Sequence, residues 1–154
     1  MLIDLIVDPD QSLNIEQIRL LVDSGIDVNA ANDYGATALH EASWKNKYSF
    51  VELLIKSGAK VDARDSAHED YKGGNTPLMH AQDARIAELL VKNGADVNAR
   101  DGDGRTALIR AAQLERGILK ELIQLGADPS IKDGSGKTAL DYAIGKKNKE
   151  HIGI

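Results

Sequence analysis

A segment of ten residues recurs four times along this chain of 154 residues. It reads Leu-Val-Asp-Ser-Gly-Ile-Asp-Val-Asn-Ala at 21–30 and returns in altered form at 54–63, 90–99 and 122–131. The glycines at its fifth position lie 33, 36 and 32 residues apart: Gly25, Gly58, Gly94 and Gly126. A period of this length is the signature of a stacked array, in which each unit buries its apolar face against its neighbours. The sequence therefore constrains the architecture strongly and says little about the molecule that the protein serves.

One unit, residues 32–64, predicts how the repeat folds. Gly35 marks a turn, and Thr37 after it is expected to cap a short helix by accepting a backbone N–H. Residues 38–43 give this helix a face of small side chains, and the apolar run at 50–55 predicts a second, largely buried helix. Gly58 is expected to end that helix in the left-handed region. The unit is thus a turn, two helices and an extended arm.

These residues resemble the ankyrin repeat family. The family pattern, roughly Asp-x-x-Gly-x-Thr-Pro-Leu-His-x-Ala-Ala and then Ile-Val-x-x-Leu-Leu-x-x-Gly-Ala-Asp-Val-Asn-Ala, is matched at 35–42, 74–78, 104–112 and 136–143. The resemblance implies an all-α fold, an ankyrin-repeat solenoid of about five stacked helix-turn-helix units with β-hairpin-like finger loops. It also implies that the fingers and the first helices form a concave binding surface.

We expect a single ankyrin-repeat domain over residues 1–154, with atypical end units. The expected units are an N-terminal cap, three internal repeats and a C-terminal cap, over 1–31, 32–64, 65–100, 101–132 and 133–154. In the first unit, 2–7 and 14–22 are predicted helices. The last unit is short: either this cap is a single helix or the chain was cut from something longer.

The composition narrows the classes of partner. A net charge of −5 without a basic stripe argues against nucleic acid, and no apolar run approaches membrane-spanning length. The chain has no cysteine, and its first residues lack the basic region of a secretory signal. We therefore expect a cytoplasmic protein that is monomeric when unbound and contacts neither nucleic acid nor membrane.

The third unit departs from the repeat twice. Its finger, from Asp65 to Gly74, is six residues longer than the stretch from Asp101 to Gly104. Its helical part is shorter, because Thr76 lies 18 residues before Gly94 whereas Thr37 lies 21 before Gly58. Inserted loops on a rigid scaffold often carry function, and drift in a tolerant loop is the alternative.

Three stretches imitate sites of other protein classes. Residues 134–138, Gly-Ser-Gly-Lys-Thr, resemble the end of a phosphate-binding loop but lack its first glycine, because position 131 is isoleucine. Asp101-Gly-Asp103-Gly resembles the start of a calcium loop whose twelfth position should be glutamate and is Ala112. An acidic cluster could in principle hold a metal, although a solvated loop explains it: Asp62, Asp65, His68, Glu69 and Asp70. We expect no catalytic residue, no metal and no cofactor.

The function expected is that of a noncatalytic protein–protein interaction module, which binds another protein through its concave face. It could be an inhibitor or immunity-type protein. The alternative is an enzyme, or a metal- or nucleotide-dependent protein, that uses the acidic finger insert or the Gly-Ser-Gly-Lys-Thr turn. For the interaction module, the expected partner-binding residues lie on the fingers and first helices: Tyr34, Trp44, Lys45, His68, Glu69, Asp70, Tyr71, Arg105, Arg110 and Gln113. Packing of Trp44 against a neighbouring helix is the alternative for that residue.

Overall fold

The structure, a computed structural model, describes residues 2–7, 14–69 and 71–152. Within these ranges the chain forms nine helices and no strand: α1 Leu2–Val7, α2 Ile15–Asp23, α3 Ala38–Trp44, α4 Tyr48–Lys56, α5 Pro77–His80, α6 Ala84–Lys92, α7 Ala107–Gln113, α8 Leu119–Gln124 and α9 Ala139–Ile152. Two isolated β-bridges, Ala31 with Thr37 and His68 with Tyr71, lie in the loops. The predicted all-α solenoid is confirmed. None of the described helices is long and apolar enough to cross a membrane.

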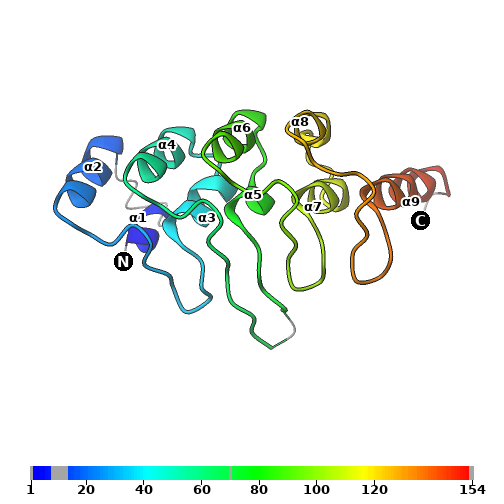
Figure 1. The fold of residues 1–154 in the computed structure, drawn as a ribbon, viewed down its shortest axis with the longest axis horizontal. Helices are drawn as coiled ribbons and strands as arrows, with labels where there is room; N and C mark the ends of the chain where they lie inside the picture. Colours follow the sequence, from blue (N-terminus) through cyan, green and yellow to red (C-terminus); the bar gives the residue numbers. More distant parts are fainter. Residues whose placement is uncertain (1, 8–13, 70, 153–154) are drawn as a thin grey trace.

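The helices form two parallel rows, as Figure 1 shows. In the inner row, α1, α3, α5, α7 and α9 pack one against the next, and in the outer row α2, α4, α6 and α8 do the same. The loops that lead into α3, α5, α7 and α9 project from the inner row, away from the outer row, as fingers (Figure 1). The finger before α5 reaches farthest, as the insertion at 65–74 predicts.

Polar side chains and glycines set the ends of the helices. Asn14 begins α2 with a capping box, in which its side chain and that of Gln17 accept each other's backbone N–H at 3.0 and 2.9 Å. The predicted cap of α3 at Thr37 is present. Gly58 has φ of 89°, which confirms the left-handed end predicted for α4, and Gly94, at the equivalent position after α6, has φ of 97°.

The core runs the length of the solenoid between the two rows. The leucine four residues before the marker glycine is fully buried in three units, where Leu54, Leu90 and Leu122 each have 0% of their surface exposed, whereas Leu21 in the first unit is half-buried. Small side chains such as Ala42 and Ala111 are buried on the inner helices, where they permit close packing of α3, α5 and α7. Each internal layer therefore depends on both of its neighbours for burial.

The third unit is abridged in its inner helix, because α5 has four residues where α3 and α7 each have seven. Arg116, which follows α7, donates from its guanidinium to the carbonyls of Met79 and Ala81 at 2.5 and 3.2 Å. Gln82 donates its side-chain N–H to the carbonyl of Trp44 at 2.9 Å. The side chains of Arg116 and Gln82 thus donate hydrogen bonds to carbonyls that backbone N–H groups of a longer helix or loop would otherwise satisfy.

Candidate functional site

Each finger is closed at its base by a single carboxamide or carboxylate. In the finger before α7, one oxygen of Asp101 accepts the backbone N–H of Asp103 and of Arg105 at 2.9 and 2.8 Å. Asn32 and Asp133 do the same in the fingers before α3 and α9. Such side-chain-to-backbone bonds hold a turn in one conformation. The bases of these three fingers are therefore fixed.

The inserted finger is closed by the same device in a modified form. Asp65 accepts the backbone N–H of Asn75 at 2.7 Å and the hydroxyl of Tyr71 at 2.5 Å. Burial raises the pKa of Asp65, but bonds from His80 and Tyr71 outweigh it, so this pKa lies below its usual value. Burial, and then the bond to Asp65, raise the pKa of Tyr71. His68 and Tyr71 exchange backbone hydrogen bonds at 2.8 and 2.7 Å, which closes the insertion as a narrow hairpin.

The fingers are also joined to one another through their backbones. The N–H of Ser66 donates to the carbonyl of Tyr34, that of Gly102 to Gly73 and that of Gly134 to Asp103, at 2.8, 2.8 and 2.7 Å. A Cβ added to Gly102 would lie 2.5 Å from the carbonyl oxygen of Lys72, so only glycine fits there. The four fingers thus form one connected surface.

Aromatic rings gather where the inserted finger meets the finger before it. The ring centroids of Tyr34 and His68 are 5.0 Å apart, and those of His68 and Tyr71 are 5.2 Å apart. We call these three residues the aromatic strip. Tyr34 has 59% of its surface exposed and His68 is also exposed, whereas Tyr71 is half-buried. Three of the predicted site positions lie close together here, since Tyr34, His68 and Tyr71 were all expected on the binding face. The predicted Glu69 is exposed beside them, and Asp70 lies outside the described residues.

The inner helices supply the second part of the predicted site. Trp44 ends α3 with 54% of its surface exposed, so more than half of it is open to solvent instead of packed on a neighbouring helix. Lys45 beside it and Gln113 at the end of α7 are half-buried. Trp44 at the end of α3 and Leu114 at the end of α7, which is 56% exposed, are thus the large apolar side chains that the ends of these inner helices expose.

The two predicted arginines have partners within the protein. Arg105 makes ion pairs with Asp101, at 3.0 Å, and with Asp103, and its side chain is 21% exposed. Arg110 donates to the side chain of Asn75 at 2.5 Å and is 18% exposed. These contacts stabilise the fingers, so both guanidinium groups have less surface to offer a partner than the sequence suggested.

His40 joins α3 to the inserted finger. Its Nδ1 accepts the backbone N–H of Thr37 at 3.1 Å, which assigns the ring proton to Nε2, and Nε2 lies 3.0 Å from the carbonyl oxygen of Asn75. Burial lowers the pKa of His40 to about 4. The histidine is therefore a neutral brace of the inserted finger.

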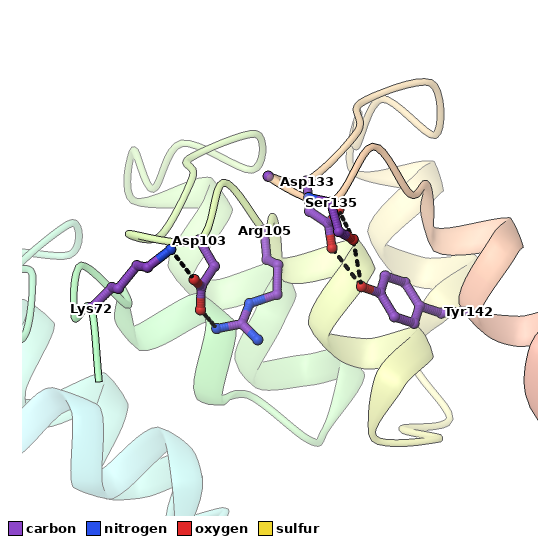
Figure 2. Close-up of a pocket in the computed structure, with 7 residues that line it drawn as sticks. Lys72, Asp103, Arg105, Asp133, Ser135 and Tyr142 are labelled. Carbon is purple, nitrogen blue, oxygen red and sulfur yellow. Dashed lines mark hydrogen bonds and ion pairs between the residues drawn. The ribbon is translucent and has the colours of Figure 1, made fainter. Parts of the chain in front are cut away.

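A polar pocket of about 380 Å³ lies between the fingers before α7 and α9 (Figure 2). On one side, Lys72 contacts Asp103 at 2.9 Å, and on the other the hydroxyl of Tyr142 donates to Asp133 at 2.6 Å. Burial raises the pKa of Asp133, but bonds from Tyr142, Ser135 and Lys137 reduce it to about 2. From the sequence, Asp103 and Ser135 were considered only as parts of the calcium-loop and phosphate-loop resemblances, and Lys72 and Tyr142 were not considered. The hydroxyl of Tyr142 donates to Asp133 as that of Tyr71 does to Asp65. A tyrosine that follows the aspartate at the base of a finger was therefore the one feature of the sequence that could have pointed to this pocket.

The Gly-Ser-Gly-Lys-Thr turn borders this pocket, and all five of its backbone N–H groups have acceptors within the protein. Gly134 donates to the carbonyl of Asp103, Ser135 and Lys137 to the carboxylate of Asp133, Gly136 to the Asp133 carbonyl, and Thr138 to the carboxylate of Asp141. A phosphate needs such N–H groups free and faces repulsion from carboxylates. In this conformation the N–H groups of the turn already donate to carboxylates and carbonyls of the protein, so they are not available to a phosphate.

The acidic cluster divides between separate roles. Asp62 accepts the backbone N–H of Asp96 in the next layer at 3.0 Å, while Asp65 closes the inserted finger. Among the described residues no three His, Cys, Asp or Glu side chains are placed to hold a metal ion. The carboxylates of Asp101 and Asp103 are likewise occupied by Arg105.

Comparison with known proteins agrees with this architecture. A family model described as ankyrin repeats (3 copies) matches residues 78–153, and one described as ankyrin repeats (many copies) matches residues 12–55, together about three quarters of the chain. The chain is 36% identical over 73 residues to human ankyrin repeat domain-containing protein 63, a match to 47% of this chain and 18% of that protein. It is 40% identical over 68 residues to serine/threonine-protein kinase 12 of Arabidopsis thaliana, covering 44% and 14% of the two chains. It is 38% identical over 77 residues to the mouse B-cell lymphoma 3 protein homolog, covering 50% and 15%.

The matches therefore cover less than a fifth of each of these relatives. What they share with this chain is the repeat, with its paired helices and projecting fingers. Ankyrin repeats generally mediate protein–protein interaction. The chain belongs to the ankyrin repeat family.

Proposed function

We propose that this protein is a noncatalytic interaction module that binds one partner protein through the aromatic strip and the exposed end of α3. The observation that supports this most strongly is the exposure of Tyr34, on the finger before α3, and of Trp44, at the end of α3. Tyrosine and tryptophan contribute a large share of the energy of protein interfaces. The chain has one Trp and four Tyr, so these two exposed rings are a considerable share of its Trp and Tyr side chains.

The rigidity of the fingers favours binding as well. The inserted finger is held by Asp65 and joined to the preceding finger by the hydrogen bond from Ser66 to Tyr34. A surface that is ordered before association loses less conformational entropy when it binds. The insertion therefore supports recognition better than a loose loop of the same length would.

A photo-crosslinking experiment tests the proposed face directly. A photoreactive phenylalanine analogue replaces Tyr34 or Trp44, and in a control it replaces Glu88, which is exposed on the outer helix α6. After irradiation in the source cell, we expect one crosslinked protein shared by the first two positions and missing from the third. A protein crosslinked from Glu88 alone would contradict the proposal.

Affinity measurements with the crosslinked partner then quantify the face. We expect Tyr34→Ala combined with Trp44→Ala to weaken binding at least tenfold, about 1.4 kcal/mol, without lowering the melting temperature. Glu88→Lys should leave affinity within about twofold. Point variants are preferable to shortening residues 66–71, because shortening also removes the bonds of Ser66 and Tyr71.

An inhibitor or immunity-type role is the finer form of the proposal, and it predicts that the partner is an enzyme whose activity falls on binding.

The opposing class, a nucleotide- or metal-dependent protein, predicts stabilisation by ATP–Mg, Ca²⁺ or Zn²⁺ in a thermal-shift screen. A ligand at 100 times its Kd stabilises by about 2.7 kcal/mol. We expect no shift with any of them, because the turn amides and the Asp101 carboxylate are already bonded.

A further inference from the structure

The rings of the aromatic strip are held in place by the rest of the two fingers. The carbonyl of Tyr34 accepts the N–H of Ser66 at 2.8 Å, and the hydroxyl of Tyr71 donates to the side chain of Asp65. The ring of His68 contacts both tyrosine rings. More than half of Tyr34 is nevertheless open to solvent. The strip is therefore a preformed aromatic surface that a partner can reach.

An aromatic surface of this kind attracts positive charge. The face of a tyrosine ring is electrostatically negative, and it binds a cation that lies within about 6 Å of the ring centroid. The carboxylate of Asp65 accepts the hydroxyl proton of Tyr71 at 2.5 Å, so a negative charge lies at the end of this phenol and polarises it. Both features favour a cation over an anion on the strip.

Two exposed carboxylates lie beside these rings. Asp33 immediately precedes Tyr34, and Glu69 immediately follows His68. In the described part of the chain, neither carboxylate lies within ion-pair distance of a basic side chain. Both carboxylates are thus available to a basic group that binds on the strip.

The basic side chains nearest in the sequence are directed toward the following layer. The inserted finger contains one lysine, Lys72, and its ammonium contacts Asp103 of the next finger at 2.9 Å. Arg64 precedes the inserted finger, and its guanidinium donates to the carbonyl of Arg100 at 2.7 Å. The finger before α3 has neither lysine nor arginine. The charge that remains beside the strip is therefore negative.

We propose that the aromatic strip binds an arginine side chain of the partner protein, with the guanidinium lying on the rings and donating to the neighbouring carboxylates of Asp33 and Glu69. Arginine fits better than lysine, because its planar guanidinium stacks on aromatic rings and carries five N–H donors. The inference rests on the proposed function, since the strip is part of the proposed binding face, and it adds the chemistry that the partner presents there.

A nuclear magnetic resonance titration of the full-length protein tests this with small probes. The probe is Nα-acetyl-arginine methylamide, and its matched control is the citrulline analogue, which has a similar shape but no charge. We expect the ring signals of Tyr34, His68 and Tyr71 to shift saturably with the arginine probe, and added sodium chloride to weaken the binding. No saturable shift with the arginine probe would overturn the proposal. So would equal affinity for the citrulline analogue or for the analogue of leucine.

Variants show whether the strip itself binds the probe. Tyr34→Leu keeps an apolar side chain but removes the ring, and Asp33→Asn combined with Glu69→Gln removes the two charges. Glu16→Gln combined with Asp23→Asn is the matched control, because these two exposed carboxylates lie on the outer helix α2. With each variant folded by circular dichroism, we expect the first two to weaken binding at least about threefold and the control to leave it unchanged. An equal loss in the control would mean that the net charge of the protein attracts the probe, and the proposal would be wrong.

The titration requires no partner protein, so its outcome is separate from that of the photo-crosslinking experiment. If Tyr34 and Trp44 crosslink to one protein and the arginine probe does not bind, the interaction module stands and the arginine proposal falls. If the probe binds the strip and neither position crosslinks to a protein, the arginine site stands and the proposed binding face is wrong.

Discussion

The buried histidine His40 makes the stability of this protein depend on pH in a defined window. Its pKa is about 4 in the folded protein, because burial disfavours the charged ring, against 6.5 for an exposed histidine. Between these values the unfolded chain binds a proton that the folded chain does not, so stability rises with pH there. The contribution is complete above pH 6.5 and is lost as the pH falls toward 4.

The magnitude follows from the two pKa values. Between pH 7.5 and pH 5 the linkage relation gives a loss of about 2 kcal/mol from this one residue. Asp133, with a pKa of about 2 against 3.8, loses its contribution only below pH 4, so the two effects occur in separate windows. A single-step decline between pH 6.5 and 5 would therefore be dominated by histidine.

Urea denaturation followed by far-ultraviolet circular dichroism, at pH values from 7.5 to 5, measures this loss. His40→Gln is the comparison, because glutamine can accept the N–H of Thr37, as Gln17 accepts that of Asn14, but does not titrate. Taking the difference between wild type and variant removes the titration of the other histidines. We expect the difference in unfolding free energy to shrink by about 2 kcal/mol from pH 7.5 to 5. A difference that is constant with pH would refute the buried, neutral state of His40.

Three further predictions concern the packing between layers. Leu54→Ala, Leu90→Ala and Leu122→Ala should each lower the unfolding free energy by roughly 2–5 kcal/mol in urea titrations, whereas Leu114→Ala, at an exposed position, should change it by less than about 0.5 kcal/mol. Gly102→Ala should destabilise the protein by roughly 1–3 kcal/mol, because the new Cβ would collide with the backbone of Lys72. Gly117→Ala is the control and should be near neutral, because nothing lies within 4 Å of a Cβ at that position. Equal melting temperatures of the two variants would count against the close contact between the fingers. Arg116→Met keeps the apolar stem but leaves the carbonyls of Met79 and Ala81 without their donor, so we expect the unfolding free energy to fall by roughly 1–3 kcal/mol. An unchanged denaturation midpoint would show that water replaces the guanidinium.

Much of the fold could be predicted because the same structural positions recur in several repeats of the sequence. The fully buried leucines Leu54, Leu90 and Leu122 recur at one position of the internal units, and so do the left-handed glycines such as Gly58 and Gly94, so a single physical argument serves them all. The second helix of the first unit, predicted over 14–22, lies at Ile15–Asp23. Local chemistry and burial agree at these positions.

The candidate site was harder to predict, because it depends on contacts between units that differ from one another. Arginine is a residue type common in interfaces, but Arg105 makes an ion pair with Asp101, and Arg110 donates a hydrogen bond to the side chain of Asn75. No spacing in the sequence shows that the ring of Tyr34 meets that of His68, since the insertion that brings them together occurs once. Which surface a partner uses stays a prediction for the same reason.

The support that Arg116 gives to α5 has a consequence for how this array can change. A guanidinium from the fourth unit completes the third, so the two form an indivisible pair although the sequence counts them as separate repeats. Replacing the fourth unit with a regular repeat would remove that arginine and leave a deletion uncompensated next door. Recombination between repeats, the usual route by which such arrays lengthen and shorten, is therefore restricted at this junction.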